Sequence, residues 1–204
     1  PRTYLEIGVA TGNSICLAAP TTRTIGVDPN PKIQNPLSSS TQIFEMTSDS
    51  FFEQENVPEL LGHQPLDLCF IDGLHTFDQA LRDFINAEKY AGPESVFLFH
   101  DCFAFEEKMA SRKRITTFWA GDVWKVIPIL ERYRPDLSLH TIRTSPTGLG
   151  LVTGMDPTST ILEESFDAIV EEYMKLSFSY LGSDPASKLR VIDNHWETIA
   201  SLLS

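Results

Sequence analysis

The chain has 204 residues, of which 42% are hydrophobic and 22% are charged, as in a soluble globular protein with one sizeable core. Its 28 acidic residues exceed its 16 basic ones, and the formal net charge of −12 argues against general nucleic-acid binding. No apolar run approaches the ~18 residues of a membrane span, and no signal-peptide pattern opens the chain, so we expect no membrane partner.

Three cysteines lie in or beside apolar runs, at Cys16, Cys69 and Cys102. Their number is odd and their spacing fits no metal finger, which predicts buried, reduced thiols and a cytoplasmic protein. The chain opens at Pro1, almost on its first predicted strand and without a methionine. We therefore expect this sequence to be a fragment that lacks a leader.

The first thirty residues carry the strongest local pattern. An apolar run, Tyr4–Ile7, is followed by a tight turn, an amphipathic stretch over Asn13–Ala19, and a second apolar run, Thr24–Val27, that ends on Asp28. This order predicts a strand, a glycine-rich turn, a helix and a second strand. It is how a doubly wound α/β sheet builds a nucleotide pocket.

Each residue type in this turn has a physical reason. Gly8 and Gly12 let the backbone adopt conformations closed to other residues and approach a ligand closely. Asp28 comes 20 residues after Gly8, and its carboxylate can accept two hydrogen bonds from ribose hydroxyls. The alternative is a strand–helix–strand unit whose glycines only ease packing.

Five more apolar runs continue the sheet. Three are expected to alternate with helices, and the last two are joined by a short link that predicts an antiparallel pair at one sheet edge: Thr41–Met46, Leu66–Ile71, Ser95–Phe99, Leu137–Arg143 and Leu149–Thr153. The predicted fold class is therefore α/β, a Rossmann-like doubly wound sheet of seven strands. The sheet is mostly parallel with a C-terminal antiparallel hairpin.

Apolar residues at helical spacing predict the remaining elements. Helices are expected over Phe51–Leu61, Thr76–Tyr90, Val123–Tyr133 (kinked at Pro128), Ile161–Leu181 and Leu189–Leu203. We expect residues 1–157 to form one domain and residues 158–204 to be a helical extension packed on it. The polar insertion Phe103–Phe118 is the best candidate for a lid over a substrate.

Five segments in order resemble a known family. EIGVATGNS, GVDP, TSDSFF, FIDGLH and FHDCF are similar to the signature segments of class I S-adenosylmethionine (SAM)-dependent methyltransferases. The closest similarity is to an O-methyltransferase-like subgroup with an IDG-x-H segment after the fourth strand and an HD pair after the fifth. The resemblance covers about Tyr4–Pro157 and implies SAM as cofactor.

The resemblance also implies roles for single residues. Glu6, Gly8, Gly12 and Asn13 match the loop that holds the methionine part of SAM, and Ala10 stands in that loop where glycine is common. The other matches are Asp28 for the ribose, Asp49 and Ser50 near the adenine, and Asp72 near the sulfonium. Alanine adds only a methyl group, so we expect Ala10 to alter the fit without removing the pocket.

Methyl transfer to a hydroxyl needs a group that removes a proton, and three catalytic candidates follow the fourth and fifth strands: His75, His100 and Asp101. Asp72, His100 and Asp101 are also the predicted ligands of Mg²⁺ or another divalent cation. Related metal-dependent enzymes carry a second acid or an asparagine where this chain has His100 and Cys102. That departure favours a softer ion or a metal-free mechanism with a histidine base, and a structural role for both histidines stays open.

The sequence therefore predicts a SAM-dependent methyltransferase that acts on a hydroxyl of a small-molecule substrate. One alternative is an NAD(P)-dependent Rossmann oxidoreductase, which is disfavoured because GVATG lacks the G-x-G-x-x-G spacing and no Tyr-x-x-x-Lys pair is present. The other alternative is a SAM-binding protein that has lost catalysis. The acceptor is not fixed by the sequence, and a homo-oligomer is left open.

Overall fold

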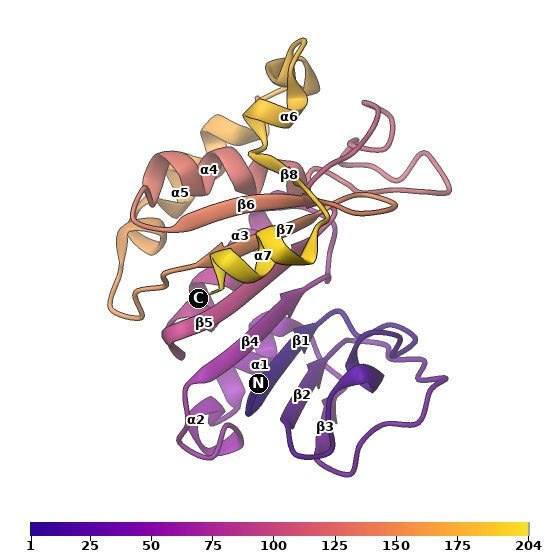
Figure 1. Ribbon diagram of the computed structural model, residues 1–204, viewed down its shortest axis with the longest axis vertical. Coiled ribbons are helices and arrows are strands. Elements are labelled where there is room, and N and C mark those ends of the chain that lie inside the picture. Colours follow the sequence, from indigo (N-terminus) through magenta and orange to yellow (C-terminus); the bar gives the residue numbers. More distant parts are fainter. Residues whose placement is uncertain (204) are drawn as a thin grey trace.

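The computed structural model describes residues 1–203 and shows one mixed sheet with the strand order β3-β2-β1-β4-β5-β7-β6-β8 (Figure 1). The strands are β1 Thr3–Ile7, β2 Arg23–Val27, β3 Thr41–Phe44, β4 Leu66–Ile71, β5 Ala91–His100, β6 Ser138–Arg143, β7 Leu149–Thr153 and β8 Val191–Asp193. Strands β1 to β5 pair in parallel, whereas β7 runs antiparallel to both β5 and β6. The predicted Rossmann-like sheet with its antiparallel hairpin is confirmed.

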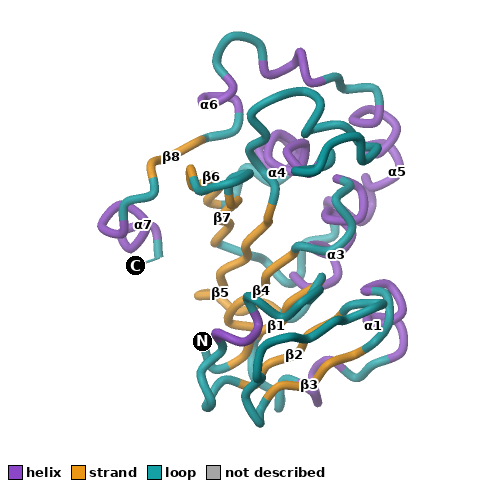
Figure 2. Tube along the Cα trace, turned by 90° about the vertical axis from the view of Figure 1, so that its right-hand side faces the viewer, coloured by secondary structure: helices purple, strands orange, loops and turns teal. Residues whose placement is uncertain are grey.

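Helices and short 3₁₀ turns join these strands. The helices are α1 Ser48–Gln54, α2 Val57–Leu60, α3 Phe77–Glu88, α4 Val126–Tyr133, α5 Ile161–Met174, α6 Pro185–Lys188 and α7 Trp196–Leu202, and the 3₁₀ turns are η1 Ile15–Leu17, η2 Val123–Lys125 and η3 Phe178–Leu181. Figure 2 shows α3 and α5 on one side of the strands and α7 on the other. None of the helices within residues 1–203 has the length and apolar character that crossing a membrane requires.

Helix α3 supplies much of the core. Its apolar residues recur at helical spacing and are buried, as the sequence pattern predicted. The ring of Phe84 lies 5.6 Å from that of Phe97 and 5.7 Å from that of Phe99, both on β5. This contact fixes α3 against the middle of the sheet, and thereby fixes the loop between β4 and α3.

Several predicted boundaries were wrong. The stretch Asn13–Ala19 forms only the 3₁₀ turn Ile15–Leu17, and the helix expected over Phe51–Leu61 is two helices. The break falls at Asn56, whose side chain accepts a hydrogen bond from the Glu59 amide and caps α2. Strand β5 begins at Ala91 rather than Ser95, where an irregularity in its pairing with β4 accommodates Gly92 and Pro93.

The expected kink at Pro128 is not needed. Helix α4 begins at Val126, so Pro128 lies in its first turn. The amides of the first turn have no partner within a helix, and a proline there removes no hydrogen bond.

The C-terminal part differs most from the prediction. Helix α5 ends at Met174 instead of continuing to Leu181, and no helix spans Leu189–Leu203. Val191 to Asp193 instead form β8, an eighth strand that pairs in parallel with β6. Residues after 157 are thus not only helical, because the unpaired edge of β6 offered hydrogen bonds that the β-branched pair Val191–Ile192 could take up.

Candidate active site

The turn after β1 brings three strand ends together. The Gly8 amide donates to the Val27 carbonyl over 2.8 Å, and the Asp72 amide donates to the Ile7 carbonyl over 2.8 Å. Gly8 has φ +90°, and a Cβ added to it would lie 2.0 Å from the carbonyl oxygen of Asp72. Only glycine fits there, so the ends of β1, β2 and β4 meet at one edge of the sheet.

Asp28 organises the other side of this turn. Its Oδ2 accepts a hydrogen bond from the Ala10 amide over 2.8 Å, and its Oδ1 accepts one from the Asn30 amide over 2.7 Å. Each carboxylate oxygen keeps a second lone pair, so Asp28 can still accept hydrogen bonds from a ligand diol. Ala10 has φ +46°, which explains why this position favours glycine.

These residues border a cavity of about 540 Å³, within the size range of small-molecule sites. It is formed by the ends of β1, β2 and β4 and by the starts of α1 and α3. Its lining consists of Ile7, Gly8, Ala10, Val27, Asp28, Pro29, Thr47, Ser48, Asp49, Asp72, Gly73, Leu74, His75 and Gln79. The structure therefore places five of the predicted cofactor residues on one cavity: Gly8, Ala10, Asp28, Asp49 and Asp72.

The other four predicted cofactor residues, Glu6, Gly12, Asn13 and Ser50, lie outside this lining. Glu6 is fully buried and accepts hydrogen bonds from the Tyr4 hydroxyl and, over 2.6 Å, from the Ser14 hydroxyl. Burial raises its carboxyl pKa. Ser50 belongs to the first turn of α1, where its amide donates to the capping hydroxyl of Thr47. Both residues hold the walls in place.

A second group of side chains gathers where β4 and β5 end. One ligand atom from each of Asp72, His75 and Asp101 lies within 4.8 Å of the others. His100 Nδ1 also lies 3.2 Å from Asp72 Oδ1 and 3.3 Å from Asp101 Oδ1. The structure thus brings together all four polar residues predicted at these strand ends, although the metal-like group contains His75 rather than the predicted His100.

The ring of His75 is held in a defined orientation. Its Nδ1 lies 2.9 Å from Asp101 Oδ2 and 2.9 Å from the carbonyl oxygen of Trp119, and both oxygens are acceptors. The proton therefore belongs on Nδ1, and Nε2, 3.7 Å from Asp72 Oδ1, keeps its lone pair when the ring is neutral. The indole of Trp119 stacks on the imidazole at a centroid distance of 5.0 Å.

Asp101 is itself fixed by its surroundings. It is buried, it has the left-handed φ of +65°, and its Oδ1 accepts a hydrogen bond from the buried Thr147 hydroxyl. Burial opposes its charge, but His100 and His75 outweigh burial and hold the pKa of this carboxyl well below its usual value. Thr147 was missed by the sequence analysis, because it arrives from a distant loop without a local motif.

The two histidines respond to the same acids. The hydrogen bonds and charges of Asp101 and Asp72 raise the pKa of His100 to about 10. For His75, burial opposes the charge, but Asp101 and Asp72 still raise the pKa overall. The cluster is therefore a compact arrangement of two carboxylates and two imidazoles, in which the carboxylates favour the protonated form of both histidines.

Gln79 is a further residue that the sequence analysis missed. Its amide nitrogen lies within hydrogen-bond distance of Ser48, Asp49 and Asp83, and its side chain lines the cavity. Gln79 is one of several polar residues on the amphipathic helix α3, and a polar residue there is common on a solvated face, so no local signal in the sequence distinguished it.

Comparison with known proteins agrees with this geometry. Residues 5–102 match a family model described as a methyltransferase domain. No curated protein matches the chain.

Three solved structures illustrate the likeness. The O-methyltransferase TomG from Streptomyces achromogenes, involved in tomaymycin synthesis and crystallised with SAM, has a TM-score of 0.58 at 18% identity and covers 76% of this chain and 74% of its own. An O-methyltransferase from Bacillus cereus in complex with S-adenosylhomocysteine (SAH) has a TM-score of 0.55 at 16% sequence identity. The match covers 74% of this chain and 73% of that protein. The SAH-bound methyltransferase PaMTH1 from Podospora anserina has a TM-score of 0.53 at 14% sequence identity. The match covers 76% of this chain and 72% of that protein. At these identities the likeness establishes a shared fold.

Proposed function

Because residues 5–102 match a family model described as a methyltransferase domain, we propose that this protein transfers the methyl group of SAM to a hydroxyl oxygen of a small molecule. The observation that carries the O-directed part is the orientation of His75. This residue lines the cavity that holds Asp28 and Asp72, and its Nδ1 lies 2.9 Å from both the Trp119 carbonyl oxygen and Asp101 Oδ2, so Nε2 is the nitrogen that can accept a proton.

The proposed reaction is a direct displacement. A bond forms between the acceptor oxygen and the methyl carbon as the carbon–sulfur bond breaks, and its electron pair remains on sulfur, leaving neutral S-adenosylhomocysteine. The hydroxyl proton passes to Nε2 of His75, and Asp101 stabilises the imidazolium that results. Positive charge on the sulfonium lowers the pKa of a nearby imidazole, which favours the neutral base at the moment of reaction.

A divalent cation is the alternative use of the same residues, because His75 cannot hold an ion and accept the hydroxyl proton with the same lone pair. Asp101 Oδ2 and His100 Nδ1 are buried without a well-aligned hydrogen bond, and buried polar atoms of this kind call for a partner. Asp72, His75 and Asp101 would hold the ion, with His100 beside them. Mixed carboxylate and imidazole donors suit Mn²⁺, Fe²⁺ or Zn²⁺ better than Mg²⁺. Such an ion would lower the pKa of the acceptor hydroxyl.

The insertion between Phe103 and Phe118 is the proposed acceptor-binding lid. Phe105 is 64% exposed and Phe118 is 68% exposed, and Leu74 on the cavity wall is 62% exposed. Apolar side chains left open beside a site favour a largely apolar or aromatic acceptor. We also propose a reducing, cytoplasmic environment, since all three cysteines are free.

Calorimetry and a methyl-transfer assay test the function together. S-adenosylhomocysteine should bind at one site, and labelled methyl should pass from SAM to a member of a panel of small alcohols and phenols. Asp101→Asn should abolish transfer while leaving S-adenosylhomocysteine affinity within ~3-fold, because Asp101 orients the base and does not line the cofactor cavity.

The same panel separates the alternatives. Tight binding without transfer to any hydroxyl, with and without added Mn²⁺, would favour the inactive SAM-binding protein. Absence of binding would remove the proposal. An NAD(P)-dependent oxidoreductase is set aside because the matched domain is a methyltransferase domain.

A further inference from the structure

The insertion that follows β5 is tied down beside His75 at two points. At the first, Arg112 Nη2 lies 2.9 Å from Asp78 Oδ1, and Arg112 Nη1 lies 3.4 Å from Asp122 Oδ2. Asp78 belongs to the first turn of α3, directly after the loop that carries His75. At the second point, the indole of Trp119 stacks on the His75 ring itself. The insertion is therefore anchored to both sides of the candidate base.

The residues between these two anchors must stay near the site. The stretch 113–118 leaves one anchor and returns to the other, so at ~3.5 Å per residue it can extend no more than ~12 Å beyond them. Internal hydrogen bonds make it more compact: Arg114 Nη2 donates to the Thr117 carbonyl over 3.4 Å, and the Thr116 hydroxyl donates to the Phe118 carbonyl over 2.6 Å. This tip of the insertion lies at the edge of the candidate active site.

The tip combines two kinds of exposed side chain. Ile115 is 63% exposed and Phe118 is 68% exposed. Lys113 and Arg114 are exposed as well, and neither has an ion-pair partner within residues 1–203. The sequence has no acid anywhere between residues 108 and 121 that could supply one nearby. An apolar surface and uncompensated positive charge therefore occur together beside His75.

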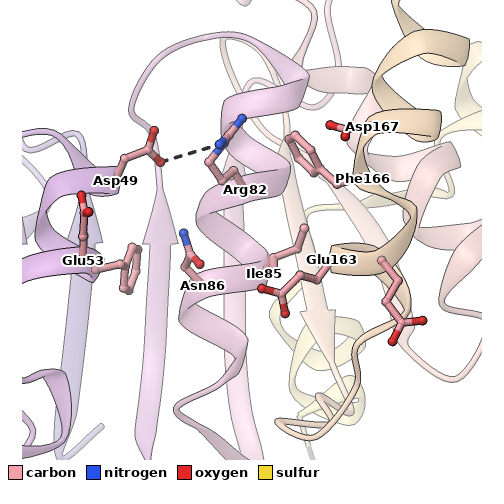
Figure 3. A pocket seen from close by; sticks show the side chains of 10 residues that line it. Asp49, Glu53, Arg82, Ile85, Asn86, Glu163, Phe166 and Asp167 are labelled. Atoms are coloured by element: carbon pink, nitrogen blue, oxygen red, sulfur yellow. Dashed lines mark ion pairs between the residues drawn. The ribbon is translucent and has the colours of Figure 1, made fainter.

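A charged cavity on another side of α3 has the opposite balance. It has a volume of about 500 Å³, it lies between α1, α3 and α5, and Glu53 and Glu163 are among the several acids that line it. Figure 3 shows its one basic side chain, Arg82, facing Asp49, with 4.0 Å between Arg82 Nε and Asp49 Oδ1. In a chain of net charge −12, the unmatched cations of the tip are a local exception, which an anionic ligand would compensate.

We infer that the acceptor of the proposed methyl transfer is an organic anion: Lys113 and Arg114 bind its carboxylate, sulfonate or phosphate group, and Ile115 and Phe118 pack on its apolar body. This inference rests on the proposed function, which brings an acceptor hydroxyl to His75. Lysine and arginine hold such groups through charge-assisted hydrogen bonds, which are stronger than neutral ones. A neutral molecule of the same shape would gain only the apolar contacts.

Two fluorescent dyes of similar shape test the inference. The dye 1-anilinonaphthalene-8-sulfonate is an aromatic anion, and N-phenyl-1-naphthylamine is the same molecule without the sulfonate. Both are titrated into protein saturated with S-adenosylhomocysteine, which keeps them out of the cofactor cavity. The wild type should prefer the sulfonate by at least ~10-fold. In Lys113→Gln/Arg114→Gln the preference should fall to within ~3-fold through weaker binding of the sulfonate alone, whereas Phe118→Ser should weaken both dyes.

The matched control is Lys89→Gln/Arg132→Gln, which also removes one lysine and one arginine, at the C-terminal ends of α3 and α4, and should behave as the wild type. Thermal unfolding shows whether each variant is folded. Should the double variant at the tip not fold, Lys113→Gln alone decides in its place, with an expected loss of at least ~3-fold in the preference.

Several outcomes would overturn the inference: equal affinity of the wild type for both dyes, an unchanged preference in the folded double variant at the tip, or the same change in the control. Cosedimentation of the wild type with phosphatidylserine vesicles, lost in that double variant, would also overturn it, since a lipid surface would then be the partner of these cations. Absence of S-adenosylhomocysteine binding in calorimetry would instead defeat the proposed function, which Asp28→Ala probes separately.

Discussion

The amide of Ala10 donates to Oδ2 of Asp28 over 2.8 Å, which ties the turn after β1 to the end of β2. This contact gives the carboxylate a fixed direction before any ligand arrives, and both residues line the same cavity. A preorganised acceptor loses little entropy when a diol binds.

Removal of that carboxylate should therefore be costly for binding. We expect Asp28→Ala to weaken S-adenosylhomocysteine by about 100-fold, because hydrogen bonds to a charged group contribute roughly 1.5–3 kcal/mol each. Isothermal titration measures the change. Asp193→Ala, which removes an exposed acid that pairs with Arg143, should leave the affinity unchanged; a similar loss in both variants would contradict the assignment.

Ala10 carries backbone strain that glycine would relieve. Its φ of +46° costs an alanine roughly 1–2 kcal/mol, part of which glycine returns through its more flexible unfolded chain. Ala10→Gly should raise the free energy of unfolding by about 0.5–1 kcal/mol in urea titrations. Ala18→Gly, at the ordinary φ of −60°, should lower it by about 0.5–1 kcal/mol. Equal changes of one sign would argue against strain at Ala10.

Alanine substitutions at Gly8 and Gly182 distinguish the cost of a steric clash from the cost of an unfavourable backbone conformation. Both have positive φ, but a Cβ on Gly8 would lie 2.0 Å from the Asp72 carbonyl oxygen, whereas one on Gly182 would meet nothing within 4 Å. Gly182→Ala should cost about 1–3 kcal/mol, because its φ of 58° and ψ of −142° lie in a region that is nearly restricted to glycine. Gly8→Ala should cost about 4 kcal/mol or more and should abolish S-adenosylhomocysteine binding. Denaturant unfolding compares the two variants. Equal losses of stability would show that the backbone at Asp72 moves away from the added methyl group at little cost.

Asp83 makes stability depend on pH. Burial of this side chain raises its pKa to about 6, although Ser48 and Gln79 hydrogen bonds oppose the rise. Between about pH 4 and pH 6 the folded chain keeps a proton that the unfolded chain has lost, so this contribution to stability disappears as pH rises. The loss should reach about 2–3 kcal/mol and stay constant above pH 6.

Asp83→Asn removes this dependence while keeping an acceptor for Gln79. As pH falls from 7 to 4, the wild type regains the stability that ionisation of Asp83 removes, whereas the variant has no such group to titrate. The difference in unfolding free energy between them should therefore shrink, and urea titrations across that range measure it. A difference that does not change with pH would mean that Asp83 is ionised throughout.

Short patterns along the chain determined much of this molecule. Buried strands read as apolar runs, and each of β1, β2, β4 and β5 leads into glycine, aspartate or histidine, so both the sheet edge and the cavity residues Gly8, Asp28 and Asp72 were predictable. These signals are local, because a buried parallel strand needs apolar side chains and a tight ligand-facing turn needs glycine.

Only the tertiary structure decided what depends on distant partners. Val191 became a strand because the edge of β6 was free, and Gln79 acquired a fixed amide because Asp49 and Asp83 converge on it. His75 and His100 have similar local sequence signals, yet only His75 meets the carbonyl oxygen of Trp119 when the chain returns to the site. The returning Thr147 fixes Asp101 beside the two imidazoles. Side-chain orientation follows from such nonlocal contacts, which no pattern in the chain order encodes.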